Sequence, residues 1–235
     1  MKRVYYFPAC GFGFWYLLGK YQALEKTEED VYVGASAGSL VCACSLIDHP
    51  TFFAVVLECA SETLEQYKRV THGLNLHRMV ALFLDQLESH IDTERIHNRL
   101  AQIRVQVSEI KGFTIRKRQI QPRSWPHMRQ LCMASCYIPW LSNQHNRLTY
   151  TVDGMACIDG AFAELYEPTL WQTFAVSSYR GLVRPSREKA THMYWTGVHE
   201  SNEDESGRVS WIVHPSLLVA ALVVATTLVL YLCAT

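Results

Sequence analysis

The sequence predicts an α/β fold followed by a C-terminal transmembrane helix, and two observations lead to this prediction. Twice before Asp48, a short strand-like run is followed by a glycine-containing turn and a helical pattern. Repeated strand, turn and helix units are typical of a sheet covered by helices. The second observation is an uncharged apolar segment near the C-terminus that is long enough to span a bilayer.

The first unit begins with Val4–Phe7, a short run of residues that favour strands. A turn containing Gly11 and Gly13 follows. Apolar side chains at helical spacing come next, at Trp15, Leu18, Tyr21 and Leu24. Because Lys2 and Arg3 precede this apolar run, a cleavable signal peptide is the alternative interpretation. The proline and glycines that interrupt the run favour the strand, turn and helix.

The second unit starts at Val31–Val33 and continues through Gly34-Ala-Ser36-Ala-Gly38 into an apolar helix that ends near Asp48. The remaining elements are expected from periodicity. Helices are predicted at residues 52–67, 76–87, 93–103 and 124–136, and strands at 104–108, 113–116, 148–152, 155–158 and 174–176. Asp153-Gly154 separates two of these strands and predicts a type I′ turn.

The C-terminal part divides into a linker and an anchor. We expect a globular domain over residues 1–195, a polar and acidic linker over 196–210 and a transmembrane tail anchor over 211–235. About 20 helical residues span the hydrocarbon core, and the segment from Ser216 to Ala234 holds no charge. A buried core helix is the alternative. A single-pass anchor at this end predicts a membrane protein whose domain faces the cytosol.

Composition excludes several classes of partner. The chain has 22 basic and 22 acidic residues, so no overall field attracts nucleic acid. Its 8 cysteines form no CxxC pair, and reduced, mostly buried thiols are expected. The 10 histidines show no metal-binding spacing, so we expect no metal. We expect no other cofactor either. One basic stretch could contact anionic lipid, or it could be an ordinary solvated hairpin face: Lys111, Arg116, Lys117, Arg118 and Arg123.

Gly34-x-Ser36-x-Gly38 between a strand and a helix is typical of a nucleophile elbow, where small residues permit a strained turn that presents the serine hydroxyl. The positive end of the following helix dipole would stabilise an oxyanion. Ser39 and Ser135 are expected to be a helix residue and a packing residue rather than nucleophiles.

A serine nucleophile needs a base, and several residues qualify. Asp159 and Asp153 are both candidates, although an Asp-Gly pair between strands is more often only a turn. His192 or His199 could complete a triad in the order of an α/β-hydrolase. The early position of the elbow argues against that fold, which places several strands before its nucleophile.

Three separated segments resemble the patatin-like phospholipase family. Residues 9–19 resemble its N-terminal glycine-rich loop and helix, Gly34–Gly38 resembles its elbow, and Ile158-Asp159-Gly160-Ala161 is similar to its aspartate segment. Ala134-Ser135-x-x-x-Pro139 also looks like a stretch upstream of that aspartate. The resemblance covers roughly residues 4 to 185. One departure is that Ala9 and Phe14 stand where the family's loop commonly has its outer glycines.

The resemblance implies a three-layer α/β/α fold and hydrolysis of lipid esters by a Ser-Asp dyad without a metal. It assigns Ser36 as the nucleophile and Asp159 as the base. It also implies that backbone donors of Gly11, Phe12 and Gly13 form the oxyanion hole. The expected partners are a lipid ester and a membrane. The alternative, raised by the altered loop, is a catalytically weak or inactive interaction protein tethered to the membrane.

Overall fold

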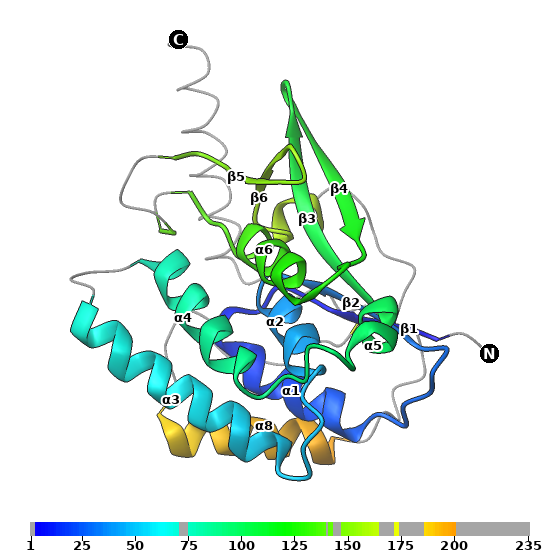
Figure 1. The fold of residues 1–235 in the computed structure, drawn as a ribbon, viewed down its shortest axis with the longest axis vertical. Helices are drawn as coiled ribbons and strands as arrows, with labels where there is room; N and C mark the ends of the chain where they lie inside the picture. The colour runs from blue at the N-terminus through cyan, green and yellow to red at the C-terminus, as the bar shows by residue number, and fades with distance from the viewer. Residues whose placement is uncertain are drawn as a thin grey trace. The chain divides into compact units, whose positions relative to one another are not determined.

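The computed structural model describes residues 3–70, 75–139, 141–142, 147–164, 172–173 and 186–200. All of them belong to one compact unit, Met1–Glu205. This unit is mixed α/β, with a mostly parallel central sheet and helices packed on it (Figure 1). The α/β class predicted from the sequence is therefore confirmed.

The sheet has a parallel centre and antiparallel additions. Four strands run parallel: β1 (Val4–Phe7), β2 (Val31–Ala35), β3 (Ile103–Lys111) and β7 (Gln172–Thr173). Three further strands are antiparallel to their neighbours: β4 (Thr114–Ile120), β5 (Tyr150–Val152) and β6 (Met155–Ile158). The order is β5-β6-β3-β2-β1-β7, and β4 also pairs with β3.

Strand β3 has three partners although a strand has only two edges. It pairs with β4 along Val105–Lys111, with β2 along Ile103–Gln106 and with β6 at Ser108 and Glu109. Because β4 occupies one edge throughout, β2 and β6 must share the other edge in succession. The end of β6 therefore meets the end of β2, since the two strands point toward each other.

The helices follow from amphipathic patterns and caps. Their bounds are α1 Phe14–Ala23, α2 Ala37–Cys44, α3 Phe52–Val70, α4 Leu76–Glu88, α5 His97–Gln102, α6 Trp125–Ser135, α7 Ala161–Glu164 and α8 Arg187–His199. The side chains of Asn75, Ser124 and Ser186 cap α4, α6 and α8, each accepting from a backbone N–H in the first turn.

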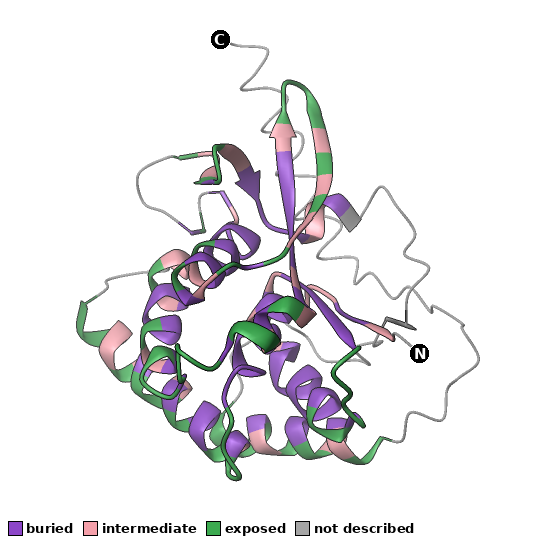
Figure 2. Cartoon of the chain, turned by 45° about the vertical axis from the view of Figure 1, so that its right-hand side comes forward, coloured by how far each residue is buried: buried purple, intermediate pink, exposed green. Residues whose placement is uncertain are grey.

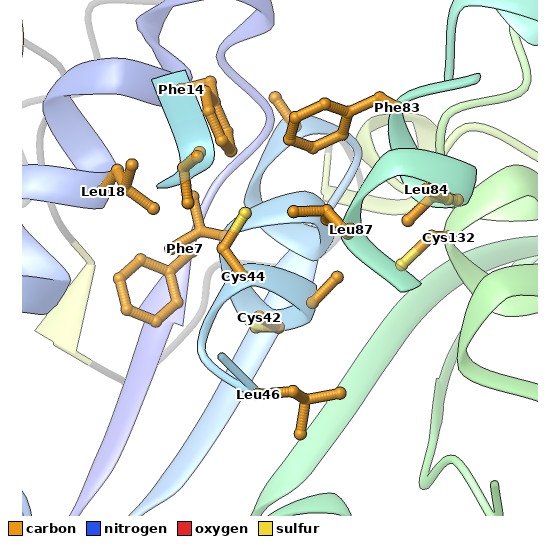
Figure 3. Packing of buried hydrophobic residues seen from close by; sticks show 14 of the residues in the cluster. Phe7, Phe14, Leu18, Cys42, Cys44, Leu46, Phe83, Leu84, Leu87 and Cys132 are labelled. Carbon is orange, nitrogen blue, oxygen red and sulfur yellow. The ribbon is translucent and has the colours of Figure 1, made fainter. Parts of the chain in front are cut away.

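Helix α2 lies at the centre of the main hydrophobic core. Figure 3 shows its Cys42 and Cys44 among side chains from β1, α1, α4 and α6. Helix α2 contacts the sheet and both flanking helices, α1 and α6. A helix that is apolar around most of its surface is stable only when buried, and this burial holds the N-terminus of α2 in place.

The central strands bury side chains on both faces of the sheet. Tyr5 and Phe7 belong to the main core, whereas Tyr6, Val33 and Ala35 form a second buried cluster on the opposite face. Strands buried on both faces are typical of parallel sheets covered on two sides. This burial is compatible with the three-layer arrangement expected from the sequence.

Helix α8 was not predicted, and it crosses residue 196, where the linker was expected to begin. It packs closely on α1 through two glycines. A Cβ on Gly19 would lie 2.0 Å from the carbonyl oxygen of Tyr194, and a Cβ on Gly197 would lie 2.2 Å from that of Tyr16. Helices approach this closely only where no side chain intervenes.

Other elements differ in their bounds from the prediction. Only His97–Gln102 of the helix expected at 93–103 is helical, and Ile103 already belongs to β3. The last described strand is Gln172–Thr173, while the predicted strand 174–176 lies outside the described residues. No helix in the described part of the chain combines the length and apolarity needed to cross a membrane. The predicted span 211–235 lies outside that part.

Candidate active site

Ser36 lies in a strained turn between β2 and α2. Its backbone has φ 51° and ψ −123°, a conformation that costs a residue with a Cβ about 1–3 kcal/mol. The two predicted elbow glycines stand where no side chain fits. A Cβ on Gly34 would lie 2.4 Å from the Gly38 carbonyl oxygen, and one on Gly38 would lie 2.0 Å from that of Phe7. The turn therefore depends on both glycines.

The strained turn directs the Ser36 hydroxyl at Asp159. Ser36 Oγ donates to Asp159 Oδ2 at 2.7 Å, a short hydrogen bond to a carboxylate. Ser36 is half-buried, whereas Asp159 is only 2% exposed. The two residues predicted as nucleophile and base thus lie in direct contact, although they are 123 positions apart in the sequence.

Burial changes the acidity of Asp159. Loss of solvent raises the pKa of its carboxyl to about 6, and hydrogen bonds from Ser36 and from the Ala161 amide oppose this rise. A carboxylate with a pKa near neutrality takes up a proton more readily than an ordinary aspartate. The environment therefore makes Asp159 a better base without making it neutral at pH 7.

The backbone around Asp159 is fixed by neighbouring elements. Its amide donates to the Tyr137 carbonyl at 2.8 Å, and the Ser108 hydroxyl donates to the Asp159 carbonyl at 2.8 Å. The second carboxylate oxygen, Oδ1, accepts the Ala161 amide at 2.9 Å. These contacts leave Oδ2 to face Ser36 and restrict the carboxylate to one orientation.

Ser135 supports the elbow from beneath, a role that differs from the packing role expected from the sequence. Its Oγ accepts the Ser36 amide at 2.8 Å and donates to the Gln106 carbonyl at 2.6 Å. Its own carbonyl accepts the Gly160 amide at 3.0 Å. Ser135 is fully buried. Its three hydrogen bonds link β3, the elbow and the aspartate segment. The sequence feature that could have indicated this role is a single hydroxyl at the apolar end of α6.

The predicted oxyanion loop, Gly11–Gly13, follows β1 and contacts α2. It forms a 3₁₀ turn in which the Gly13 amide donates to the Cys10 carbonyl at 2.9 Å. Within the described residues, the amides of Gly11 and Phe12 have no hydrogen-bond acceptor. Two of the three predicted donors therefore have no acceptor among the described residues, whereas the third is satisfied within the loop.

Phe14, which stands where a glycine was expected from the resemblance, is buried in the main core. Its ring lies in the core, where it faces Phe83 at 5.8 Å between ring centroids (Figure 3). The centroid of the Trp15 ring is 5.1 Å away. Phe14 is the first residue of α1, so the side chain contributes to helix packing. The ring of this bulky residue is therefore buried in the core.

The other candidates for the base lie elsewhere. Asp153 has φ 49° and Gly154 has φ 75°, as the predicted type I′ turn requires. The Asp153 carboxylate pairs with Arg123 at 2.6 Å and with His127 at 3.0 Å. His192 and His199 are exposed on α8. None of the three is the acceptor of the Ser36 hydroxyl.

The remaining polar groups near the dyad are structural. Ser39 donates its hydroxyl to the Ser36 carbonyl at 2.6 Å and is completely buried. In the described part of the chain, the seven cysteines are free thiols, all buried except the half-buried Cys10. No group of three or more histidine, cysteine or acidic side chains among the described residues is placed to hold a metal ion.

Comparison of the chain with protein-family models gives no match. No curated protein matches it either. The chemistry of the site is therefore inferred from its geometry.

Proposed function

We propose that the protein is a serine acyl-hydrolase that cleaves carboxylic esters of lipids with a Ser36–Asp159 dyad. The observation that carries this proposal is the 2.7 Å hydrogen bond from a serine in a strained elbow to a buried carboxylate. The pKa of that carboxylate, raised by burial to about 6, suits a base that works near neutral pH. The likeness of three segments to the patatin-like phospholipases supports the choice of lipid esters as substrates.

The first half of the reaction forms an acyl-enzyme. Ser36 Oγ attacks the ester carbonyl carbon while its proton passes to Asp159 Oδ2. The amides of Gly11 and Phe12 donate to the oxyanion that develops on the carbonyl oxygen, and the start of α2 adds its positive dipole. The tetrahedral intermediate then collapses, the bond to the alcohol breaks, and the alcohol leaves with the proton from Asp159.

The second half releases the fatty acid. Asp159, again ionised, removes a proton from water, whose oxygen attacks the acyl carbon bound to Ser36. Collapse of this second intermediate breaks the bond to Ser36 Oγ, which recovers its proton from Asp159. One ester bond and one water are consumed, and one alcohol and one acid are formed.

Active-site labelling tests the dyad. A fluorophosphonate probe should react with Ser36 in the parent chain and should not label Ser36→Ala. Hydrolysis of phospholipid and triacylglycerol should fall by at least about 10³-fold in Ser36→Ala and in Asp159→Asn. Ser61→Ala serves as the matched control, because this hydroxyl is exposed on α3 and bonds only the Leu57 carbonyl of its own helix. Full hydrolysis by both dyad variants would refute the proposal.

A second candidate is a non-catalytic, membrane-tethered interaction protein of the same fold. One observation favours it: the Gly13 amide is bound to the Cys10 carbonyl and so is not offered to an oxyanion. The probe distinguishes the two candidates, because an inactive protein would carry an unreactive Ser36 despite the short hydrogen bond. A chain that binds lipid without labelling or hydrolysis would favour the second candidate.

We also propose that residues 211–235 anchor the protein in a membrane with its domain in the cytosol. The uncharged segment from Ser216 to Ala234 supports this, because about 20 apolar residues suffice for one span. The tether would raise the effective concentration of the domain at a lipid surface. Extraction of cell membranes with alkaline carbonate should leave the full chain in the membrane pellet, whereas release into the supernatant would contradict the anchor.

A further inference from the structure

The β3–β4 hairpin ends in an exposed apolar tip. Phe113 is 91% exposed, more than the other exposed large apolar side chains of the described residues, Val70, Leu141 and Trp195. It follows Gly112, which has φ 59° and open space on its Cβ side. Figures 1 and 2 both show the hairpin running out from the sheet, and Figure 2 shows its tip coloured as exposed. An aromatic ring in water gains free energy when an apolar phase covers it, so the ring is available for such a contact.

The tip is surrounded by positive charge. Residues 109–118 contain four cationic side chains and a single carboxylate, Glu109. Glu109 is already paired with Arg118, whose Nε donates to it at 2.6 Å. Lys111 and Arg116 are exposed on either side of Phe113. The tip therefore presents an aromatic ring between cations, which is the chemistry that matches an anionic lipid surface.

The tip and the Ser36–Asp159 dyad both lie at the end of the sheet where the parallel strands finish. Gln106 pairs with Ala35, the residue before Ser36, and Ser108 pairs with Ile158, the residue before Asp159. From Gln106, β3 continues for five more residues to Lys111. At a rise of about 3.3 Å per residue, the tip extends roughly 17 Å beyond the level of the elbow. A surface that receives the tip would therefore face the carboxyl ends of the parallel strands.

The shape of the tip distinguishes a lipid from a protein partner. A stable protein interface buries about 800 Å² on each partner and has a packed apolar centre. A narrow hairpin with one exposed aromatic side chain does not supply such an area. A bilayer interface deforms around a single inserted ring and binds flanking cations through its headgroups.

We infer that the β3–β4 hairpin tip inserts Phe113 into an anionic lipid surface, with Lys111 and Arg116 bound to the headgroups. This contact goes beyond ester hydrolysis, because it requires neither Ser36 nor turnover. It is also separate from the predicted C-terminal anchor, and it would set the orientation of the domain rather than its attachment. Because the tip extends beyond the carboxyl ends of the parallel strands, its insertion would turn that end of the sheet, which carries Ser36, toward the membrane.

Depth-dependent quenching tests the insertion directly. Phe113→Trp and Val70→Trp are made in the full chain carrying Ser36→Ala. This background removes the proposed nucleophile, so the lipids of the vesicles are not hydrolysed. Each is mixed with vesicles of phosphatidylcholine and phosphatidylglycerol that carry brominated acyl chains, and the emission of the parent chain is subtracted. Val70 is the matched control, because it is 57% exposed at the end of α3, outside the hairpin. Emission from position 113 should shift to the blue and be quenched, whereas emission from position 70 should not.

Charge variants test the role of the headgroups. Arg116→Gln in the Phe113→Trp chain should require about fivefold more anionic lipid for the same quenching, as expected for loss of one cation near the surface. Lys189→Gln, an exposed cation on α8, is the control and should cause no shift. Equal quenching at positions 113 and 70, absence of quenching at 113, or quenching independent of anionic lipid would each overturn the inference. All these readouts use the inactive chain, so failure of the hydrolase proposal would leave them interpretable.

Discussion

Replacing Asp159 with asparagine should stabilise the protein at neutral pH while abolishing hydrolysis. The pKa of the carboxyl is raised from its ordinary value of 3.8 to about 6 because burial disfavours the ion. The native protein therefore binds this proton more tightly than the unfolded chain does. The stability contributed by the neutral carboxyl is complete below about pH 4 and is lost as pH rises through about 6. A difference of about 2 between the pKa values corresponds to about 3 kcal/mol.

Asparagine cannot ionise, so it avoids this loss. The side-chain oxygen of asparagine can still accept the Ala161 amide, and the geometry of the segment should survive. The free energy of unfolding of Asp159→Asn minus that of the parent should therefore increase by about 2 to 3 kcal/mol between pH 4 and pH 8. Most of this increase should occur below about pH 6.5.

Urea unfolding of the full chain measures the difference, and the buried Trp125 provides a fluorescence signal. Asp48→Asn is the control, because its side chain is 89% exposed and its pair with Arg99 lies in solvent. The curves of this control and of the parent should remain parallel across the pH range. A difference between Asp159→Asn and the parent that did not change with pH would refute the claim that burial raises this pKa.

Four further outcomes follow from the site. Because the base must be ionised, kcat/KM for a soluble ester should rise about tenfold per pH unit below pH 6 and level above it; a flat profile would contradict the role of Asp159. Ser135→Ala, which leaves the Ser36 amide without its acceptor, should cost about 1–3 kcal/mol in urea unfolding and lower kcat; unchanged values would contradict it. Gly38→Ala, whose Cβ would lie 2.0 Å from the Phe7 carbonyl, should cost roughly 3 kcal/mol or more, against about 1 kcal/mol for Gly112→Ala in open space; equal melting temperatures would refute this. Ser36→Gly and Ser36→Ala should both be inactive, with glycine about 1 kcal/mol more stable because it relieves φ 51°; the reverse order would argue against strain.

Local sequence patterns predicted the elements that hold the site. The apolar runs before Gly34 and before Asp159 became β2 and β6, and Asp153-Gly154 formed its expected turn. These features depend on residues next to one another, so propensity and turn chemistry suffice to find them. The contact between Ser36 and Asp159 was suggested by a resemblance of motifs and could not have come from spacing alone.

The missed features depend on tertiary contacts. Helix α8 contains Thr191, Thr196 and Gly197, which weaken its helical signal, and it becomes stable by packing on Gly19 of α1. The role of Ser135 depends on which amide lies beside it, which a linear pattern does not reveal. The succession of β2 and β6 along one edge of β3 is likewise a matter of pairing between distant segments.

Because β2 and β6 pair with the same edge of β3, this strand sets the distance between Ser36 and Asp159. The pairing of Gln106 with β2 fixes where Ser36 lies along β3, and the pairing of Ser108 with β6 fixes where Asp159 lies. The distance between the two side chains therefore depends on the register of both pairings. Lengthening the connections before Ile103 or before Tyr150 would leave that distance unchanged. A slip of β6 by a single residue would move the carboxylate by about 3.3 Å and turn it to the other face of the sheet. Selection on this chemistry would therefore act on strand pairing and leave loop length free to vary.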